Sequence, residues 1–268
     1  MLNDITLGQY FPGTSFIHRL DPRTKLLVTF VYIAALFVAK WYVSYAAILA
    51  ALLFCINVTK IKPSAFFRGL KPLLFIIIFT AVINLFATKG GEVLWSWWKL
   101  TITTAGTQLA FLMVARILLL ISGTLILTYT TTPIALTDGL ELLLDPLKKL
   151  NVPVHEFSMM MSIALRFIPT LIEEADKISN AQKARGADFE TGSLTERAKA
   201  LLPLLVPLFV SAFRRADELA IAMEARCYHG GEGRTRMKKL LIRPADIWTM
   251  AGSGVFLAGI IVLSGYGL

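Results

Sequence analysis

The sequence predicts an all-α integral membrane protein with about five transmembrane helices and a cytoplasmic region of amphipathic helices. Hydrophobic residues make up 56% of the 268 residues and charged residues only 17%, and the mean hydropathy is +0.65. These values lie well outside the usual composition of a soluble domain. A helix that crosses a bilayer needs about 20 largely apolar residues. Five segments qualify, with the shorter ones flanked by basic or aromatic residues: 26–39, 41–58, 73–87, 107–130 and 247–263.

Taken in order, these segments divide the chain into three parts. Lys40 alone separates the first two spans, which indicates a tight helical hairpin. Residues 1–131 then form a membrane domain with four spans, residues 132–246 form a cytoplasmic helical region, and residues 247–268 form the last transmembrane helix. No basic start followed by an apolar run and a small-residue cleavage site is present, so we expect no secretory signal.

The distribution of lysine and arginine predicts the orientation, because cytoplasmic loops are enriched in basic residues. The side that includes the N-terminus carries Arg19, Arg23, Lys25, Lys60, Lys62, Arg68 and Lys71, whereas the opposite side carries Lys40, Lys89 and Lys99. We therefore expect a multi-pass protein of the cell membrane with a cytoplasmic N-terminus and an outside C-terminus. The cytoplasmic region has 16 basic and 15 acidic residues, so most of the net charge of +9 lies near the membrane. This favours contact with the lipid bilayer over a nucleic-acid footprint.

The cytoplasmic region is predicted to be helical throughout. Thr132 and Pro133 are typical of a helix start, and Pro153 ends that helix. A helix after Glu156 ends at Arg185, with Gly186 in the position where glycine commonly follows a helix. Another begins at Ser193, whose spacing to Glu196 is that of a capping box. Its apolar early part is interrupted by Pro203 and Pro207. A wide apolar stripe follows, formed by Phe209, Ala212, Phe213, Ala216, Leu219, Ala220 and Met223.

The two helices end in a repeat. Ala175-Asp176 and, five residues later, Ala181-Gln182-Lys183-Ala184-Arg185-Gly186 return 41 residues on as Ala216-Asp217 and Ala222-Met223-Glu224-Ala225-Arg226-Cys227. An arginine in a last helical turn is usually a simple cap that interacts with free carbonyls. Capping alone does not require the same alanines and aspartate at the same offsets. Small Ala184 and Ala225 let a tip approach a partner closely, and a guanidinium binds a carboxylate through two parallel hydrogen bonds. We therefore interpret the two ends as docking tips, and we place the stripe of Phe209, Phe213, Ala216 and Leu219 against other hydrophobic surface.

Four motifs occur in order along the chain: His18-Arg19-Leu20-Asp21-Pro22-Arg23-Thr24-Lys25-Leu26, Arg166-Phe167-Ile168-Pro169, Ala184-Arg185-Gly186, and Arg215-Ala216-Asp217-Glu218-Leu219-Ala220. Together they resemble one known family, the transmembrane coupling subunits of energy-coupling-factor transporters. The resemblance extends from about residue 10 to the last span. One departure is Cys227, which stands where the family signature has glycine. A left-handed backbone conformation at this position would be strained for cysteine, so we expect the second helix to end differently.

The resemblance implies a prokaryotic importer of a vitamin or a metal ion, in which this chain is a non-catalytic subunit. Its implied partners are two cytoplasmic ABC-type ATPase subunits, which bind ATP and magnesium, and one membrane substrate-capturing subunit. Arg185 and Arg226 would pair with acidic residues of the two ATPases. Closure of the ATPases would then move both helices and reorient the substrate-capturing subunit.

The residues also bear on two alternatives, a membrane-embedded enzyme and a self-sufficient carrier. An enzyme would need a nucleophile with a base, or paired carboxylates, at membrane depth, and the predicted spans hold neither histidine nor acid. A carrier would need a polar stripe from several spans, and only Asn57, Asn84 and Arg116 are candidates. We interpret Arg116 as a structural arginine that faces the bundle, with contact to a partner protein as the alternative. The closest match to a phosphate-binding loop, after Gly8, has threonine in place of the essential lysine, and no histidine pair has metal-ligand spacing. We expect no cofactor and no metal in this chain.

Overall fold

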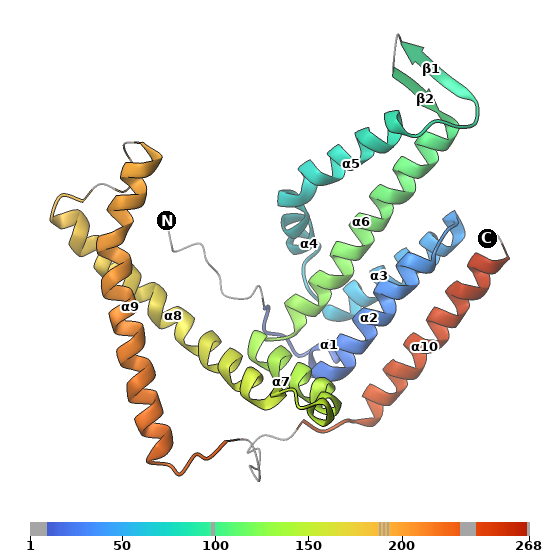
Figure 1. Ribbon diagram of the computed structural model, residues 1–268. Coiled ribbons are helices and arrows are strands. Elements are labelled where there is room, and N and C mark those ends of the chain that lie inside the picture. The colour runs from blue at the N-terminus through green and yellow to red at the C-terminus, as the bar shows by residue number, and fades with distance from the viewer. Residues whose placement is uncertain are drawn as a thin grey trace. The chain divides into compact units, whose positions relative to one another are not determined.

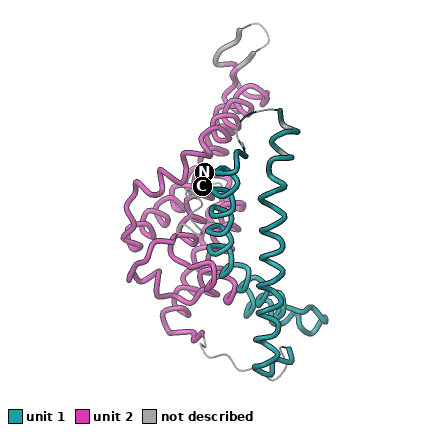
Figure 2. Tube along the Cα trace, turned by 90° about the vertical axis from the view of Figure 1, so that its left-hand side faces the viewer, with its two compact units in different colours: residues 1–7, 140–239 teal, residues 8–139, 240–268 magenta. Residues whose placement is uncertain are grey.

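The structure, a computed structural model, describes residues 10–97, 100–187, 189, 191, 193–230 and 240–266. The chain forms two compact units, shown in different colours in Figure 2. Among the described residues, the membrane unit combines those from 10 to 139 with those from 240 to 266, and the second unit contains those from 140 to 230.

The membrane unit contains most of the helices of the chain (Figure 1). In chain order its elements are α1 (Phe16–Arg19), α2 (Pro22–Val38), α3 (Tyr42–Thr59), α4 (Pro63–Leu70), the short 3-10 turn η1 (Lys71–Leu73), α5 (Leu74–Ala87), β1 (Val93–Trp97), β2 (Leu100–Thr103), α6 (Thr104–Thr130), the start of α7 (Pro133–Leu144) and α10 (Pro244–Gly265). The prediction of an all-α membrane protein is confirmed, with one small hairpin as an exception.

Among the described residues, four segments are long and apolar enough to cross a bilayer, judged by length and composition: Tyr42–Thr59, Pro63–Ala87, Thr104–Thr130 and Pro244–Gly265. They correspond to four of the five predicted spans. The first predicted span forms α2, a helix of 17 residues that packs along α10 and α6. Its crossing of the membrane stays a prediction, because a helix of that length falls short of the roughly 20 residues that a bilayer requires.

The hairpin of β1 and β2 joins α5 to α6 and was not predicted. Its strands are antiparallel, with Val93 opposite Thr103 and Trp97 opposite Leu100. The segment is rich in tryptophan, valine, isoleucine and threonine, the residue types that favour strands. Thr103 ends the hairpin and caps α6, because its hydroxyl accepts a hydrogen bond from the Gly106 amide at 3.2 Å.

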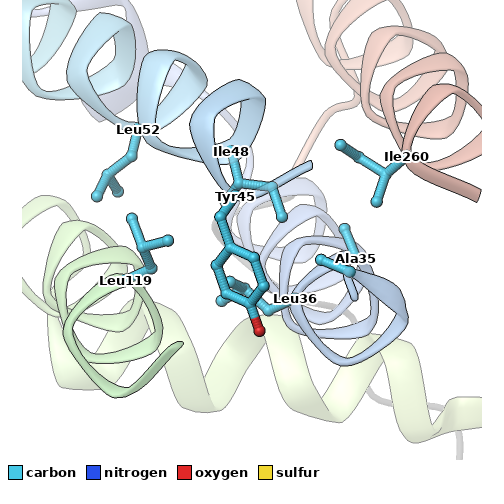
Figure 3. Close-up of a cluster of buried hydrophobic side chains, with 8 residues drawn as sticks. Ala35, Leu36, Tyr45, Ile48, Leu52, Leu119 and Ile260 are labelled. Carbon is cyan, nitrogen blue, oxygen red and sulfur yellow. The ribbon is translucent and has the colours of Figure 1, made fainter. Parts of the chain in front are cut away.

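The core of the membrane unit lies where α2, α3, α6 and α10 meet (Figure 3). Leu36 and Ile48 are fully buried there, and Ile260 is 1% exposed. Packing of this kind stabilises helices inside a membrane, where no hydrophobic effect drives the helices together. The buried members of the cluster are Ala35, Leu36, Ala39, Tyr45, Ile48, Leu52, Leu119 and Ile260.

A buried polar cluster fixes the start of α2 to the start of α10. Asp246 accepts hydrogen bonds from the backbone amides of Asp21 and Arg243, both at 2.8 Å, so one carboxylate serves two chain segments. Asp21 in turn caps α2 and pairs with Arg23 at 3.1 Å. Lys25 donates to the carbonyl of Thr130 at the end of α6, at 2.8 Å. Burial lowers the pKa of Lys25 to about 8, against the opposing effect of the nearby carboxylates.

The second unit is built from two long helices, α8 (Val154–Ala184) and α9 (Leu194–Glu224), preceded by the end of α7 and a 3-10 turn, η2 (Asp145–Leu150). Each long helix has 31 residues and is therefore roughly 46 Å long. His155 Nδ1 lies 2.9 Å from Glu141 Oε1 and connects the start of α8 to α7. The predicted capping box of Ser193 and Glu196 is present.

Prolines do not end either long helix. Pro169 lies inside α8, and Pro203 and Pro207 lie inside α9. Pro203 and Pro207 therefore interrupt the apolar pattern of the sequence but not the helix, because α9 is continuous through both. Each internal proline removes one helical hydrogen bond, which makes bending the expected local response.

Candidate functional site

The carboxyl end of α8 has the hydrogen bonds of a left-handed helix cap. Gly186 donates to the carbonyl of Lys183 and Ala187 donates to the carbonyl of Gln182, both at 3.0 Å. Gly186 has a φ of +88°, a conformation that glycine adopts without strain. Arg185 is the last residue before the chain turns away, so its side chain leaves the helix at the tip.

The carboxyl end of α9 repeats this geometry with a shift of 41 residues. Cys227 donates to the carbonyl of Glu224 at 2.9 Å, and Tyr228 donates to the carbonyl of Met223 at 3.0 Å. Cys227 itself has a φ of +57°. The expectation that cysteine would make this helix end differently was wrong. The two terminal hydrogen bonds hold the left-handed residue in place, at a cost of roughly 1–2 kcal/mol for a residue with a side chain.

The two tips present their side chains to the surface of the second unit. Ala184, Arg185 and Gly186 are exposed, and so are Ala225, Arg226 and Cys227. Within the described ranges, neither Arg185 nor Arg226 has an ion pair or a side-chain hydrogen bond. Figure 1 shows the carboxyl ends of α8 and α9 pointing apart, so the unit offers two separate arginine tips.

The structure adds a contact that the sequence pattern alone did not reveal. Arg215 Nη2 of α9 donates to Glu174 Oε2 of α8 at 2.8 Å, and the two side chains are 35% and 23% exposed. Hydrogen bonds from Ser211 and Arg215 lower the pKa of Glu174. Farther along, Gln182 Nε2 donates to the carbonyl of Pro203 at 3.4 Å. The carboxyl half of α8 therefore runs beside the middle of α9 in the antiparallel sense, and the contacts include the repeated segment.

The apolar stripe of α9 remains largely uncovered in its own unit. Phe209 is 61% exposed and Phe213 is 70% exposed, and Ala216 is exposed as well. Leu219 is half-buried. An apolar patch of this kind usually marks an interaction surface. Its placement against another protein stays a prediction.

Arg116 of α6 faces other helices of the membrane unit. Its Nε donates to the hydroxyl of Tyr45 at 2.8 Å, and its Nη2 donates to the carbonyl of Ala39 at 3.1 Å. The guanidinium carbon also lies 5.9 Å from the ring centroids of Phe37 and Tyr45. Ala39 caps the carboxyl end of α2, so Arg116 satisfies a carbonyl that the helix leaves free. Arg116 therefore contacts α2 and α3 in this unit, and its purely structural role stays a prediction.

Comparison with known proteins gives consistent results along nearly the whole chain. The sequence profile of a family described as "Cobalt transport protein" (CbiQ) matches residues 13–237. The "Energy-coupling factor transporter transmembrane protein EcfT" of Ruminiclostridium cellulolyticum is 51% identical over 263 residues, which are 98% of each protein. Proteins with the same name are 53% identical over 247 residues in Clostridium kluyveri, 92% of each protein, and 46% identical over 262 residues in Bacillus subtilis, 98% of this chain and 97% of that protein.

Proposed function

The chain belongs to the CbiQ family of transport proteins and is a membrane-embedded component of a transporter, and we propose that it couples ATP hydrolysis elsewhere to substrate uptake in an energy-coupling-factor importer. The proposal is supported most directly by the two helix ends. Both present an exposed arginine on the same left-handed cap, 41 residues apart, although one cap uses a strained cysteine. Simple capping gives no reason to retain the same geometry at that cost.

Each tip docks in a groove of one cytoplasmic ATPase subunit. A planar guanidinium suits a partner carboxylate because two parallel hydrogen bonds form at once, and Ala184 and Ala225 leave room for close approach. The two ATPases bind ATP with magnesium and hydrolyse it, and this chain carries no catalytic group. Movement of the ATPases shifts α8 and α9, which lie against each other through Glu174 and Arg215.

The apolar stripe of α9 meets the third partner, a membrane protein that captures the substrate. Phe209 and Phe213 are large, apolar and exposed, which suits a partner that itself lies in or at the membrane. The imported substrate is a vitamin or a metal ion. In this arrangement the N-terminus and both tips are cytoplasmic and the C-terminus is outside.

Reconstitution in vesicles tests the proposal against the two alternatives. A coupling subunit alone neither hydrolyses ATP nor binds solute, and it supports ATP-dependent uptake when the two ATPases and a substrate-capturing protein are added. Turnover by the purified chain alone would identify an enzyme. Solute binding by the purified chain alone would identify a carrier.

A further inference from the structure

The membrane unit contains a cavity of about 470 Å³ that the coupling function does not use. Its walls come from α1, α2, α3, α6 and α10, and most of the lining side chains are aliphatic or aromatic. The volume lies in the range of sites that bind small organic ligands. Representative lining residues are Val28, Leu52, Cys55, Ile126, Leu127 and Phe256.

The polar side chains in the wall are already engaged. Thr29, Thr130, Thr249 and Ser253 each donate to a backbone carbonyl of their own helix, at 2.7–2.8 Å. Tyr32 donates to the carbonyl of Leu119 at 2.8 Å.

Lys25, the one charged residue among the described residues of the wall, donates to the carbonyls of Thr130 and His18. A polar ligand would therefore find few free partners in the wall. The chemistry of the cavity instead suits an apolar chain, because apolar groups in contact with such walls gain dispersion energy.

The position of the cavity indicates where such a chain would come from. α3, α6 and α10 are all segments long enough to cross a bilayer, and Phe54, which lines the cavity, is 69% exposed on α3. The cavity is therefore accessible from the surface that faces lipid.

Basic residues lie close in sequence to the lining residues. Arg19 follows the lining residue Ile17 by two positions, and Lys60 follows Val58 by two positions. Both basic residues are exposed and have no ion pair in the part of the chain that the structure describes. The two cations lie at the ends of α1 and α3, which contact each other, and cations near a membrane surface attract negatively charged headgroups.

We propose that the cavity binds an acyl chain of an anionic phospholipid, whose phosphate lies near Arg19 and Lys60. Binding of this kind would fill the space between α2, α3 and α10 next to the core cluster. The proposal applies to the chain by itself and within the assembled transporter, and it does not depend on the ATPase partners.

Gly252 of α10 offers a direct way to fill the cavity. It lines the cavity, and a side-chain carbon added there meets no atom within 4 Å. Gly254 and Gly259 on the same helix have equally open surroundings but are not in the cavity wall. Gly252→Leu therefore places a leucine side chain in the cavity, and Gly254→Leu is its matched control. Gly252→Ala and Gly252→Val provide intermediate sizes if the leucine variant folds poorly.

The experiment uses the full chain in phosphatidylcholine vesicles with a small fraction of phosphatidylglycerol that carries a diazirine in one acyl chain. After irradiation, mass spectrometry maps the labelled residues. We expect adducts at Leu52, Cys55 and Phe256 that fall severalfold from Gly252→Ala to Gly252→Leu and stay unchanged in Gly254→Leu. Phe75, which is 77% exposed on α5, serves as a reference for bulk lipid. The same label on phosphatidylcholine, or the double change Arg19→Ala and Lys60→Ala, should give weaker labelling in the cavity.

Three results would overturn the proposal. Labelling in the cavity that Gly252→Leu leaves unchanged would show that the lipid does not enter it. Equal labelling by both headgroups would remove the role of the anionic phosphate. Labelling that disappears once a partner membrane protein is added would show that a protein side chain, and not lipid, occupies the cavity in the assembled transporter.

Discussion

Glu174 and Arg215 are separated by 41 residues, the spacing of the repeat, and form an ion pair with a nitrogen-to-oxygen distance of 2.8 Å. They hold the same position in the two repeated segments, each directly before the shared Ala-Asp pair. Ala175, the next residue of α8, is only 9% exposed, and the ion pair beside it shows that α8 and α9 are in contact at this point. Opposite charges at one repeat position thus join the two tip helices to each other.

Reversing this charge pair tests whether it sets the contact between α8 and α9. Glu174→Arg or Arg215→Glu alone places like charges together, and we expect slower disulfide formation between Gln182→Cys and Pro203→Cys in a chain without Cys55 and Cys227. The double reversal should restore the rate. Glu173→Arg, at an exposed neighbouring position, should leave the rate unchanged. A double reversal no better than the single changes would show that the ion pair does not hold the helices.

The same pair should persist under mild acid. Its hydrogen bonds to Ser211 and Arg215 lower the pKa of Glu174 below the ordinary value of 4.5. A lowered carboxyl pKa contributes stability that is present above the ordinary value and is lost as the pH falls through the lowered one. The distance between spin labels attached to Gln182→Cys and Pro203→Cys, measured by pulsed electron paramagnetic resonance, should therefore stay constant down to about pH 4.5 and change only below it.

Cys227→Gly should stabilise the end of α9. Glycine adopts the left-handed conformation without a side-chain clash, which removes roughly 1 kcal/mol of strain. Hydrogen exchange of the Cys227 and Tyr228 amides should become about fivefold slower. Gly186→Ala at the equivalent position of α8 should have the opposite effect. Faster exchange in Cys227→Gly would mean that cysteine contributes a contact that outweighs its strain.

Local chemistry made much of the second unit predictable. Ser193 and Glu196 form their capping box, and Gly186 follows the end of α8, because caps depend on residues only a few positions apart. The end of α9 was predicted less well. There the hydrogen bonds of the cap outweighed the strain at Cys227, and the strength of those bonds was not visible in residue types.

Contacts distant in sequence could not be predicted in the same way. Asp246 binds the amide of Asp21 across 225 positions, and no periodicity relates the two. The Glu174–Arg215 pair left a usable signal, namely opposite charges at one position of the repeat, but using it required knowing that the helices meet there. The hairpin between α5 and α6 was missed because its apolar and aromatic residues also suit the end of a membrane span.

Phe213→Asp should separate the two kinds of partner. A carboxylate in the centre of the apolar stripe opposes contact with another hydrophobic surface, so recovery of the substrate-capturing protein should fall more than recovery of the ATPases. Phe157→Asp, at an exposed phenylalanine of α8, is the control. Quantitative co-purification measures the effect, and equal recovery of every subunit would argue against the stripe as the interface.

Cysteine labelling tests the proposed orientation. The native Cys227 is exposed on the side predicted to be cytoplasmic, so a membrane-impermeant maleimide should label it only after the cells are permeabilised. Tyr266→Cys, near the carboxyl end of α10, should be labelled in intact cells when Cys55 and Cys227 are replaced by serine. Labelling of both positions from the same side would require an even number of crossings between Cys227 and Tyr266, which contradicts a single crossing by α10.

The size of the effect of removing a tip arginine distinguishes docking from capping. Removing a guanidinium that pairs with a carboxylate in a desolvated groove should weaken binding by about 2 to 5 kcal/mol, because the partner charge remains buried and unpaired. An exposed cap is worth only about 0 to 1 kcal/mol.

We expect Arg185→Ala and Arg226→Ala each to weaken ATPase association and transport, and the double change to abolish both while the chain still inserts in the membrane. Arg214→Ala, an exposed arginine of α9 away from the tip, should have little effect. Lysine at either tip should rescue only in part, since it keeps the charge but loses the planar geometry. Because both tips share one backbone geometry, Arg226 should matter as much as Arg185. Normal assembly and transport by the double alanine variant would show that the two arginines are ordinary helix caps.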